Sequence, residues 1–105
     1  MGATAVQVKG VSTFPLAKED IALVVPSDIP VARVEQVVRQ GAGALAESVT
    51  LFDVYEGDQV EQGHRSLAFA LRLRGDHTLT AKEAEDVRRA VVAKARKALG
   101  ARLRA

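Results

Sequence analysis

The chain has 105 residues, of which 48% are hydrophobic and 27% charged, and its net charge at neutral pH is +2. These values are typical of one globular domain with a modest core, and they leave no room for a second domain. The absence of cysteine excludes disulfides, thiolate metal sites and cysteine nucleophiles. No apolar run approaches the ~20 residues of a membrane span and the first residues do not resemble a signal peptide, so we expect a cytoplasmic protein.

The first third of the sequence predicts one strand and one helix. Residues 1–13 show little periodicity and are expected to be an extended lead-in to a domain that spans 14–105. The continuous apolar run at 21–25 is typical of a central strand. Over 31–45 the apolar residues recur at three- and four-residue steps, which indicates a helix with one buried face, and the glycines within 41–43 loosen its end.

Two further strands are predicted around an acidic loop at 57–63. Residues 49–56 are rich in β-branched and aromatic side chains, and residues 66–74 alternate strictly between apolar and small or basic side chains. The alternation predicts that one side of this strand faces the core. The side chains on that side are Leu67, Phe69, Leu71 and Leu73.

A second helix is marked by its start and its stop. Thr80 and Glu83 have the spacing of a capping box, in which each side chain accepts a hydrogen bond from the backbone amide of the other residue. Gly100 ends the helix, and residues 101–105 can close the sheet as a short last strand. The predicted apolar stripe of the helix is Ala84, Val87, Val91, Ala95 and Ala98.

The element order β-α-β-β-α-β predicts an α+β, ferredoxin-like fold. Its four-stranded antiparallel sheet carries both helices on one face and leaves the other face open. This topology serves metabolite sensors, small phosphatases and RNA-binding modules, so it does not choose a function.

The acidic stretch before the third strand raises the question of a metal or acid-base site. It lacks the spacing of a calcium loop, and His64 and His77 form neither a zinc pair nor a catalytic triad with a neighbour. We therefore predict no catalytic residue and no metal ligand. The acids of the loop are interpreted as solvated residues, and both histidines as ordinary surface residues.

The C-terminal end of the chain is strongly basic. Such a patch attracts phosphate backbones, but it also complements the negative end of a helix macrodipole, and charge alone leaves both interpretations open. No acid follows residue 86, whereas the cations after it are Arg88, Arg89, Lys94, Arg96, Lys97, Arg102 and Arg104.

Several stretches resemble one family over nearly the whole chain, from Phe14 to Arg104. They are "FPLAKEDIALVV" at 14–25, "LFDVYEG" at 51–57, "SLAF" at 66–69, "TLTAKE" at 78–83 and "LGARLR" at 99–104. Together they look like the ferredoxin-fold anticodon-binding domain at the C-terminus of the phenylalanine–tRNA ligase β chain.

The resemblance implies that the chain is part of a larger β chain in an α2β2 enzyme that joins phenylalanine to its tRNA. In that family the aminoacylation centre, with ATP and magnesium, belongs to the α chain. The domain itself would need no cofactor, would be inactive alone, and would hold the anticodon stem-loop of tRNA-Phe.

The sequence departs from the family at one position. Where the family usually has Arg-Asp, this chain has Glu19 and Asp20, and Lys18 is the cation that could partly replace the missing arginine. If that arginine approaches phosphate, Glu19→Arg would tighten RNA binding. If it braces Asp20 or a neighbouring domain, the same substitution would alter stability or docking instead.

The open face of the sheet is the candidate RNA-binding surface. Small side chains let an unstacked base approach a sheet, and guanidinium groups bind phosphate or stack on a base. The alternative is that the small residues only fill strands beneath a partner domain and that the arginines are solubilising. The face of Tyr55 is undecided by its strand pattern. The candidate residues are Lys18, Tyr55, Ser66, Ala68, Ala70, Arg72, Arg74, Arg102 and Arg104.

Two rival functions share the topology. An amino-acid sensor would be dimeric and usually has a glycine in the loop between the first strand and the first helix, whereas residues 25–33 contain none. A small acyl-phosphate hydrolase needs an anion-cradling loop at the same place, and the sequence shows none there.

Overall fold

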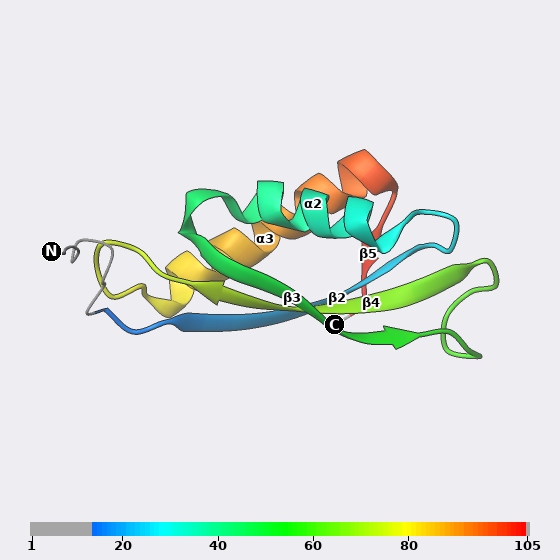
Figure 1. Ribbon diagram of the computed structural model, residues 1–105, viewed down its shortest axis with the longest axis horizontal. Coiled ribbons are helices and arrows are strands. Elements are labelled where there is room, and N and C mark those ends of the chain that lie inside the picture. Colours follow the sequence, from blue (N-terminus) through cyan, green and yellow to red (C-terminus); the bar gives the residue numbers. More distant parts are fainter. Residues whose placement is uncertain (1–13, 105) are drawn as a thin grey trace, which may run out of the picture.

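The computed structural model describes residues 14–104, so the predicted lead-in at 1–13 lies outside the described residues. The chain forms a four-stranded antiparallel sheet with both helices on one face, which confirms the predicted βαββαβ fold (Figure 1). The strand order is β3-β4-β2-β5. The elements are β2 (Ala17–Pro26), α2 (Val31–Ala42), the 3₁₀ turn η1 (Gly43–Leu45), β3 (Ala46–Tyr55), β4 (His64–Leu73), α3 (Ala81–Leu99) and β5 (Arg102–Leu103).

The core lies between the sheet and the helices, and β4 is its centre. The apolar side chains at 67, 69, 71 and 73 are fully buried, as their alternation predicts. The register of β2 against β4 places Ile21 opposite Phe69 and Leu23 opposite Leu67, so that both strands turn their large side chains to the helices. Side chains two residues apart share a face of a strand, and this register therefore fixes which face is covered.

Each helix buries one stripe against the sheet. The stripe of α2 is Val34, Val37, Val38 and Ala42, and that of α3 is Ala84, Val91, Ala95 and Leu99. The prediction that Ala98 completes the second stripe is wrong, because Ala98 is exposed. Leu99 takes its place together with Ala101, the residue that leads from the helix into β5. Within the described residues, neither helix has the length and apolar character that crossing a membrane requires.

The predicted capping box at the start of α3 is confirmed. The Thr80 hydroxyl accepts a hydrogen bond of 3.1 Å from the Glu83 amide, and the Thr80 amide donates one of 2.9 Å to the Glu83 carboxylate. The predicted stop is confirmed as well, since Gly100 has the left-handed conformation with φ 67°. A residue with a side chain would be strained there, so glycine turns the chain from the helix into β5.

Gly41 has a role that its sequence context did not indicate. It is the second-last residue of α2, at the end that the glycines were expected to loosen, and a Cβ atom built on it would be 2.8 Å from the Cα atom of Val91 in α3. Real Cβ atoms do not approach a backbone atom so closely. The glycine therefore allows the two helices to come into direct backbone contact.

We expect Gly41→Ala to destabilise the domain by about 1–3 kcal/mol, because the new methyl group must push α3 away from α2. In an ordinary helix the same change would stabilise by up to ~1 kcal/mol. Urea denaturation measures the difference. Gln40→Ala is the matched control, since Gln40 is the exposed neighbour in the same turn. A Gly41→Ala protein as stable as this control would show that the helices separate without cost.

Candidate nucleic-acid interface

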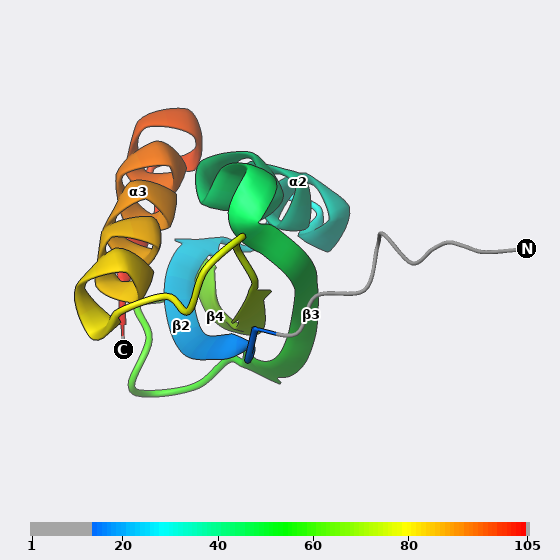
Figure 2. The ribbon, with the colours of Figure 1, turned by 90° about the vertical axis from the view of Figure 1, so that its left-hand side faces the viewer.

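The uncovered face of the sheet has small side chains along its middle. The register places Ala22 of β2 opposite Ala68 of β4, both on the side away from the helices. Further along the same face, Asp20 lies opposite Ala70 and Lys18 opposite Arg72. Figure 2 shows both helices on the other side of the sheet, so no helix covers this surface. The structure thus brings most of the predicted candidate residues onto one face.

One end of this face is closed by the loop between β3 and β4, residues 56–63, which we call the β3–β4 loop. Ser66 is only 3% exposed, although the sequence indicated an open position. Val24 and Val60 are buried as well, and neither belongs to the core between sheet and helices. The loop passes below the sheet in Figure 2. The loop covers the end of β3 and the start of β4, and this position explains why Ser66 is buried.

The last two arginines of the chain contact this loop. The Arg102 guanidinium lies 3.3 Å from the Glu61 carboxylate. The Arg104 guanidinium donates a hydrogen bond of 3.1 Å to the side-chain oxygen of Gln59. Glu61 is exposed, as its interpretation as a solvated loop residue predicts, and it also forms this ion pair with Arg102. β5 pairs with β2 over two residues, so these side-chain contacts add to a short ladder.

The structure decides the face on which Tyr55 lies. Tyr55 is the register partner of Ser66, which places it on the uncovered face. The Arg104 guanidinium lies 4.7 Å from the centre of its ring, within the range of a cation–π contact. A Cβ atom on Gly57 would be 2.5 Å from the phenol oxygen, so the loop backbone also lies directly against Tyr55.

Arg72 and Arg74 have carboxylate partners of their own. Arg72 is 3.7 Å from Asp20 across the β2–β4 pair, and Arg74 is 2.6 Å from Glu47. The Arg74 guanidinium also donates to the carbonyl oxygen of Phe14. The hydrogen bond between the Glu47 and Arg74 side chains lowers the pKa of Glu47 and raises the pKa of Arg74. Both arginines are therefore partly neutralised, whereas the exposed Lys18 has no ion pair within the part of the chain described here.

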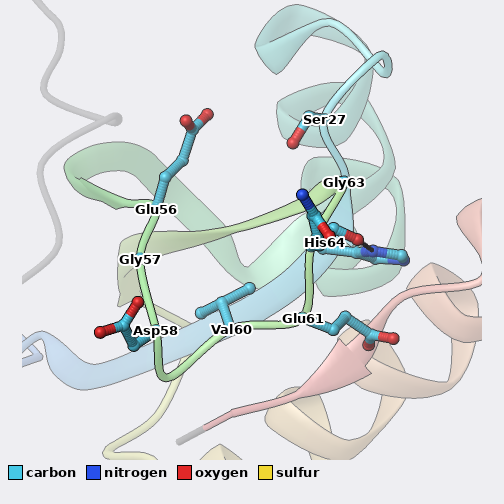
Figure 3. A pocket seen from close by; sticks show the side chains of 9 residues that line it. Ser27, Glu56, Gly57, Asp58, Val60, Glu61, Gly63 and His64 are labelled. Carbon is cyan, nitrogen blue, oxygen red and sulfur yellow. Dashed lines mark hydrogen bonds between the residues drawn. The ribbon is translucent and has the colours of Figure 1, made fainter.

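The acidic stretch that raised the question of a metal site lines an open hollow of about 540 Å³ beside the β2–α2 connection. Its carboxylates point in different directions rather than toward a common centre (Figure 3). Among residues 14–104 no group of histidine, cysteine or acidic side chains is arranged to hold a metal ion. The residues that line the hollow are Ser27, Glu56, Gly57, Asp58, Val60, Glu61, Gln62, Gly63 and His64.

His77 is more than an ordinary surface residue. Its ring nitrogens lie 2.9 Å from the Asp76 carboxylate and 2.7 Å from the Glu83 carboxylate. The hydrogen bond with Asp76, and after it the one with Glu83, raises the pKa of His77. The backbone hydrogen bond from Thr80, and then His77, lowers the pKa of Glu83. The histidine thus extends the capping box, which spacing alone did not reveal.

Glu19 lies on the helix-covered side of the sheet, away from the candidate RNA surface. It is the register partner of Leu71, and its carboxylate is 3.9 Å from the Arg88 guanidinium on α3. Both side chains are about a quarter exposed. This position favours a bracing role for residue 19 over a contact with RNA.

Fold and surface together define a ferredoxin-like α+β module whose sheet is open on one face. Residues 12–104 match the family described as "Ferredoxin-fold anticodon binding domain", and the chain belongs to this family. The family description is one of binding and not of catalysis.

Relatives of the chain are β subunits of phenylalanine–tRNA ligase. The chain is 55% identical over 95 residues to the protein of Thermobifida fusca, and 54% identical over 99 residues to that of Cutibacterium acnes. It is 53% identical over 105 residues to the protein of Streptomyces avermitilis. These matches cover 90%, 93% and 97% of the chain but only 11%, 12% and 13% of the relatives. The chain therefore spans about one eighth of their length.

We expect Glu19→Arg to lower the free energy of unfolding by up to about 1 kcal/mol, because it places two guanidinium groups together at a partly exposed site. The exchanged pair, Glu19→Arg with Arg88→Glu, should recover most of this loss. Urea denaturation of the two variants decides the matter. Equal stability of the single and the exchanged variants would exclude a bracing role for the pair.

The raised pKa of His77 predicts a pH-dependent stability. The protonated ring stabilises the folded state. This stabilisation is fully present when the pH is below 6.5, the ordinary pKa of histidine, and it is lost as the pH rises through the higher pKa of the folded state. Relative to His77→Gln, the wild type should lose stability over that interval. Denaturation at several pH values and the NMR titration of the ring measure this.

The matched control for that experiment is His64→Gln, since the His64 ring contacts the Gln62 carbonyl group instead of a carboxylate. Its stability difference from the wild type should vary less with pH. If His77→Gln and wild type change in parallel, the ion pairs of His77 do not contribute to folding.

Proposed function

We propose that this domain binds the anticodon stem-loop of tRNA-Phe through the uncovered face of its sheet. The observation that carries the proposal is the middle of that face, where Ala22, Ala68 and Ala70 leave room above the strands. Membership of the anticodon-binding family supports the same conclusion. Single-stranded loops are recognised when their unstacked bases reach a protein surface that offers stacking and hydrogen-bonding groups.

The edges of this small-residue region supply those groups. At one end the Arg104 guanidinium lies over the Tyr55 ring, 4.7 Å from its centre, so that a planar cation and an aromatic ring are neighbours. Asp53, which is the register partner of Ala68, and Thr50, the partner of Ala70, offer oxygen atoms along β3. Planar and polar groups therefore border the alanines, and this combination suits an unpaired base better than a flat apolar surface does.

The β3–β4 loop positions the end of the proposed surface. Glu61 and Gln59 hold the two C-terminal arginines against the sheet, and Val60 is buried below them. An arginine held by its own protein loses less conformational freedom on binding than a free one does. The loop would thus prepare Arg102 and Arg104 for contact with RNA.

Within a whole protein, we propose that the domain is part of a phenylalanine–tRNA ligase β chain in an α2β2 enzyme of the cytoplasm. ATP and magnesium would then act at a centre in the α chain, and this domain would contribute RNA binding only. An amino-acid sensor of the same topology is the weaker candidate, because the connection between β2 and α2 has no glycine and the family match is to an anticodon-binding domain.

The central test is Ala68→Glu. A carboxylate in the middle of the face both fills the space for a base and repels phosphate, so we expect binding of the tRNA-Phe anticodon stem-loop to weaken at least about tenfold, which corresponds to ~1.4 kcal/mol. Titration of the labelled stem-loop, with an unrelated stem-loop alongside, measures the effect. The wild type should prefer the tRNA-Phe loop.

Ala32→Glu is the matched control. Ala32 is exposed in the first turn of α2, where an added carboxylate is tolerated or favoured by the helix dipole. It changes the net charge by the same amount on the opposite side of the molecule. Equal effects of the two substitutions would place RNA binding elsewhere than on the sheet.

A further inference from the structure

We propose that the C-terminal half of α3 is a second RNA-contact surface, which binds the phosphate backbone of the stem while the sheet holds the loop. The surface consists of Lys94, Arg96 and Lys97. The inference rests on the proposed function, because it takes the RNA as the ligand. It goes beyond that function by assigning the phosphate contacts to the helix side of the domain.

The first step is that the sheet arginines are poorly placed to attract phosphate at a distance. Arg72, Arg74 and Arg102 each have a carboxylate within 4 Å, and Arg104 is engaged by Gln59 and Tyr55. A paired arginine presents little net charge beyond the first few ångströms, since the fields of the two partners largely cancel. These arginines can make short-range contacts but supply little long-range attraction.

The second step is that the cations at the end of α3 have no such partners. Lys94, Arg96 and Lys97 are all exposed, and none has an ion pair or hydrogen bond through its side chain within residues 14–104. The sequence has no acid after Asp86, so none from the same helix can reach them.

The earlier cations of α3 differ in this respect. Lys82 pairs with Asp86, Arg89 with Glu85, and Arg88 with Glu19. Free positive charge on the helix is thus concentrated in its last two turns, which are the part closest to β5 in sequence.

The third step is the course of the chain from this helix to the sheet. α3 turns at Gly100 into β5, and β5 descends from the helix layer to the edge of the sheet, where it pairs with β2 (Figure 1). Arg102 lies on that strand and Arg104 follows directly after it. The end of α3 that carries the free cations therefore leads directly into the strand that forms the edge of the proposed loop-binding face.

The macrodipole of α3 is the competing explanation for these cations. Arg96 and Lys97 are in the last turn, where positive charge is favourable. At the same end the Gly100 amide donates to the carbonyl groups of Ala95 and Arg96. If the dipole were the sole reason for the three cations, their removal would lower stability and leave RNA binding unchanged.

The experiment compares two hairpins that share the tRNA-Phe anticodon loop, one with a short stem and one with the stem extended by several base pairs. Affinity is measured at several salt concentrations for the wild type and for Lys94→Ala/Arg96→Ala/Lys97→Ala. Each phosphate contact contributes roughly 0.7–0.9 to the log-log salt slope. For the long-stem hairpin, the log-log salt slope of the triple variant should therefore be smaller in magnitude than that of the wild type by about 2–3. Its affinity at low salt should be at least about tenfold weaker, and neither change is expected with the short stem.

Two further variants separate contact from net charge and from folding. Arg33→Ala/Lys82→Ala/Arg89→Ala removes the same charge from exposed positions elsewhere on the helices, and it should leave the slope for the long stem nearly unchanged. Lys94→Arg/Arg96→Lys/Lys97→Arg keeps the charge and should bind as the wild type does. Urea denaturation of all three variants checks that each is folded.

The outcomes distinguish this inference from the proposed function. If the triple variant and the charge-matched control have the same slope with the long stem, the α3 surface is not an RNA contact, even if Ala68→Glu still abolishes loop recognition. A wild type that binds neither hairpin would overturn the proposed function and this inference together. A slope reduced equally for short and long stems would also overturn the assignment to the stem.

Discussion

The alternation of β4 is the constraint on which the rest of the structure depends. This strand pairs with β2 on one side and with β3 on the other, so its register decides the faces of both neighbours. Its large apolar side chains all point to the helices, which leaves only small or basic side chains for the other face. A shift by one residue would bury Arg72 and expose Phe69, and the cost of that exchange holds the register in place. The fully buried core and the uncovered surface are therefore two consequences of one pattern.

Charge pairing divides the surface into two parts with different properties. On the sheet, acids from β2, β3 and the β3–β4 loop accompany the arginines and hold them in defined positions. On the last turns of α3, the cations have no acid near them in sequence. Defined but neutralised groups favour short-range recognition, whereas free charges favour sequence-independent attraction to a polyanion. This division agrees with our proposals that the sheet recognises the RNA loop and that the end of α3 holds the RNA phosphate backbone.

The β3–β4 loop connects the two edges of the sheet. It begins at β3, buries Val60 below the strand ends, and reaches Arg102 and Arg104 on the far side. β5 contributes only two residues to the ladder, so the loop supports a strand that would otherwise be weakly held. Gly57 and Gly63 serve this path in different ways. Gly57 lies directly against the Tyr55 ring, and Gly63 has a φ of 81°, which few other residues adopt.

The sequence by itself determined the element order, the buried face of β4, the capping box at Thr80 and the helix stop at Gly100. Each of these is a local property, set by the period of side chains along a strand or helix or by the hydrogen-bonding needs of a helix end. Resemblance also indicated the anticodon-binding family to which the chain belongs. Only the tertiary structure decided which acid accompanies which arginine, that Ser66 is buried, that Tyr55 faces the open surface, and that Glu19 faces Arg88. The ion pairs among them join residues 27 to 69 positions apart in sequence, from Glu47 with Arg74 to Glu19 with Arg88. No local period relates such positions, because the register and the fold of the β3–β4 loop bring them together.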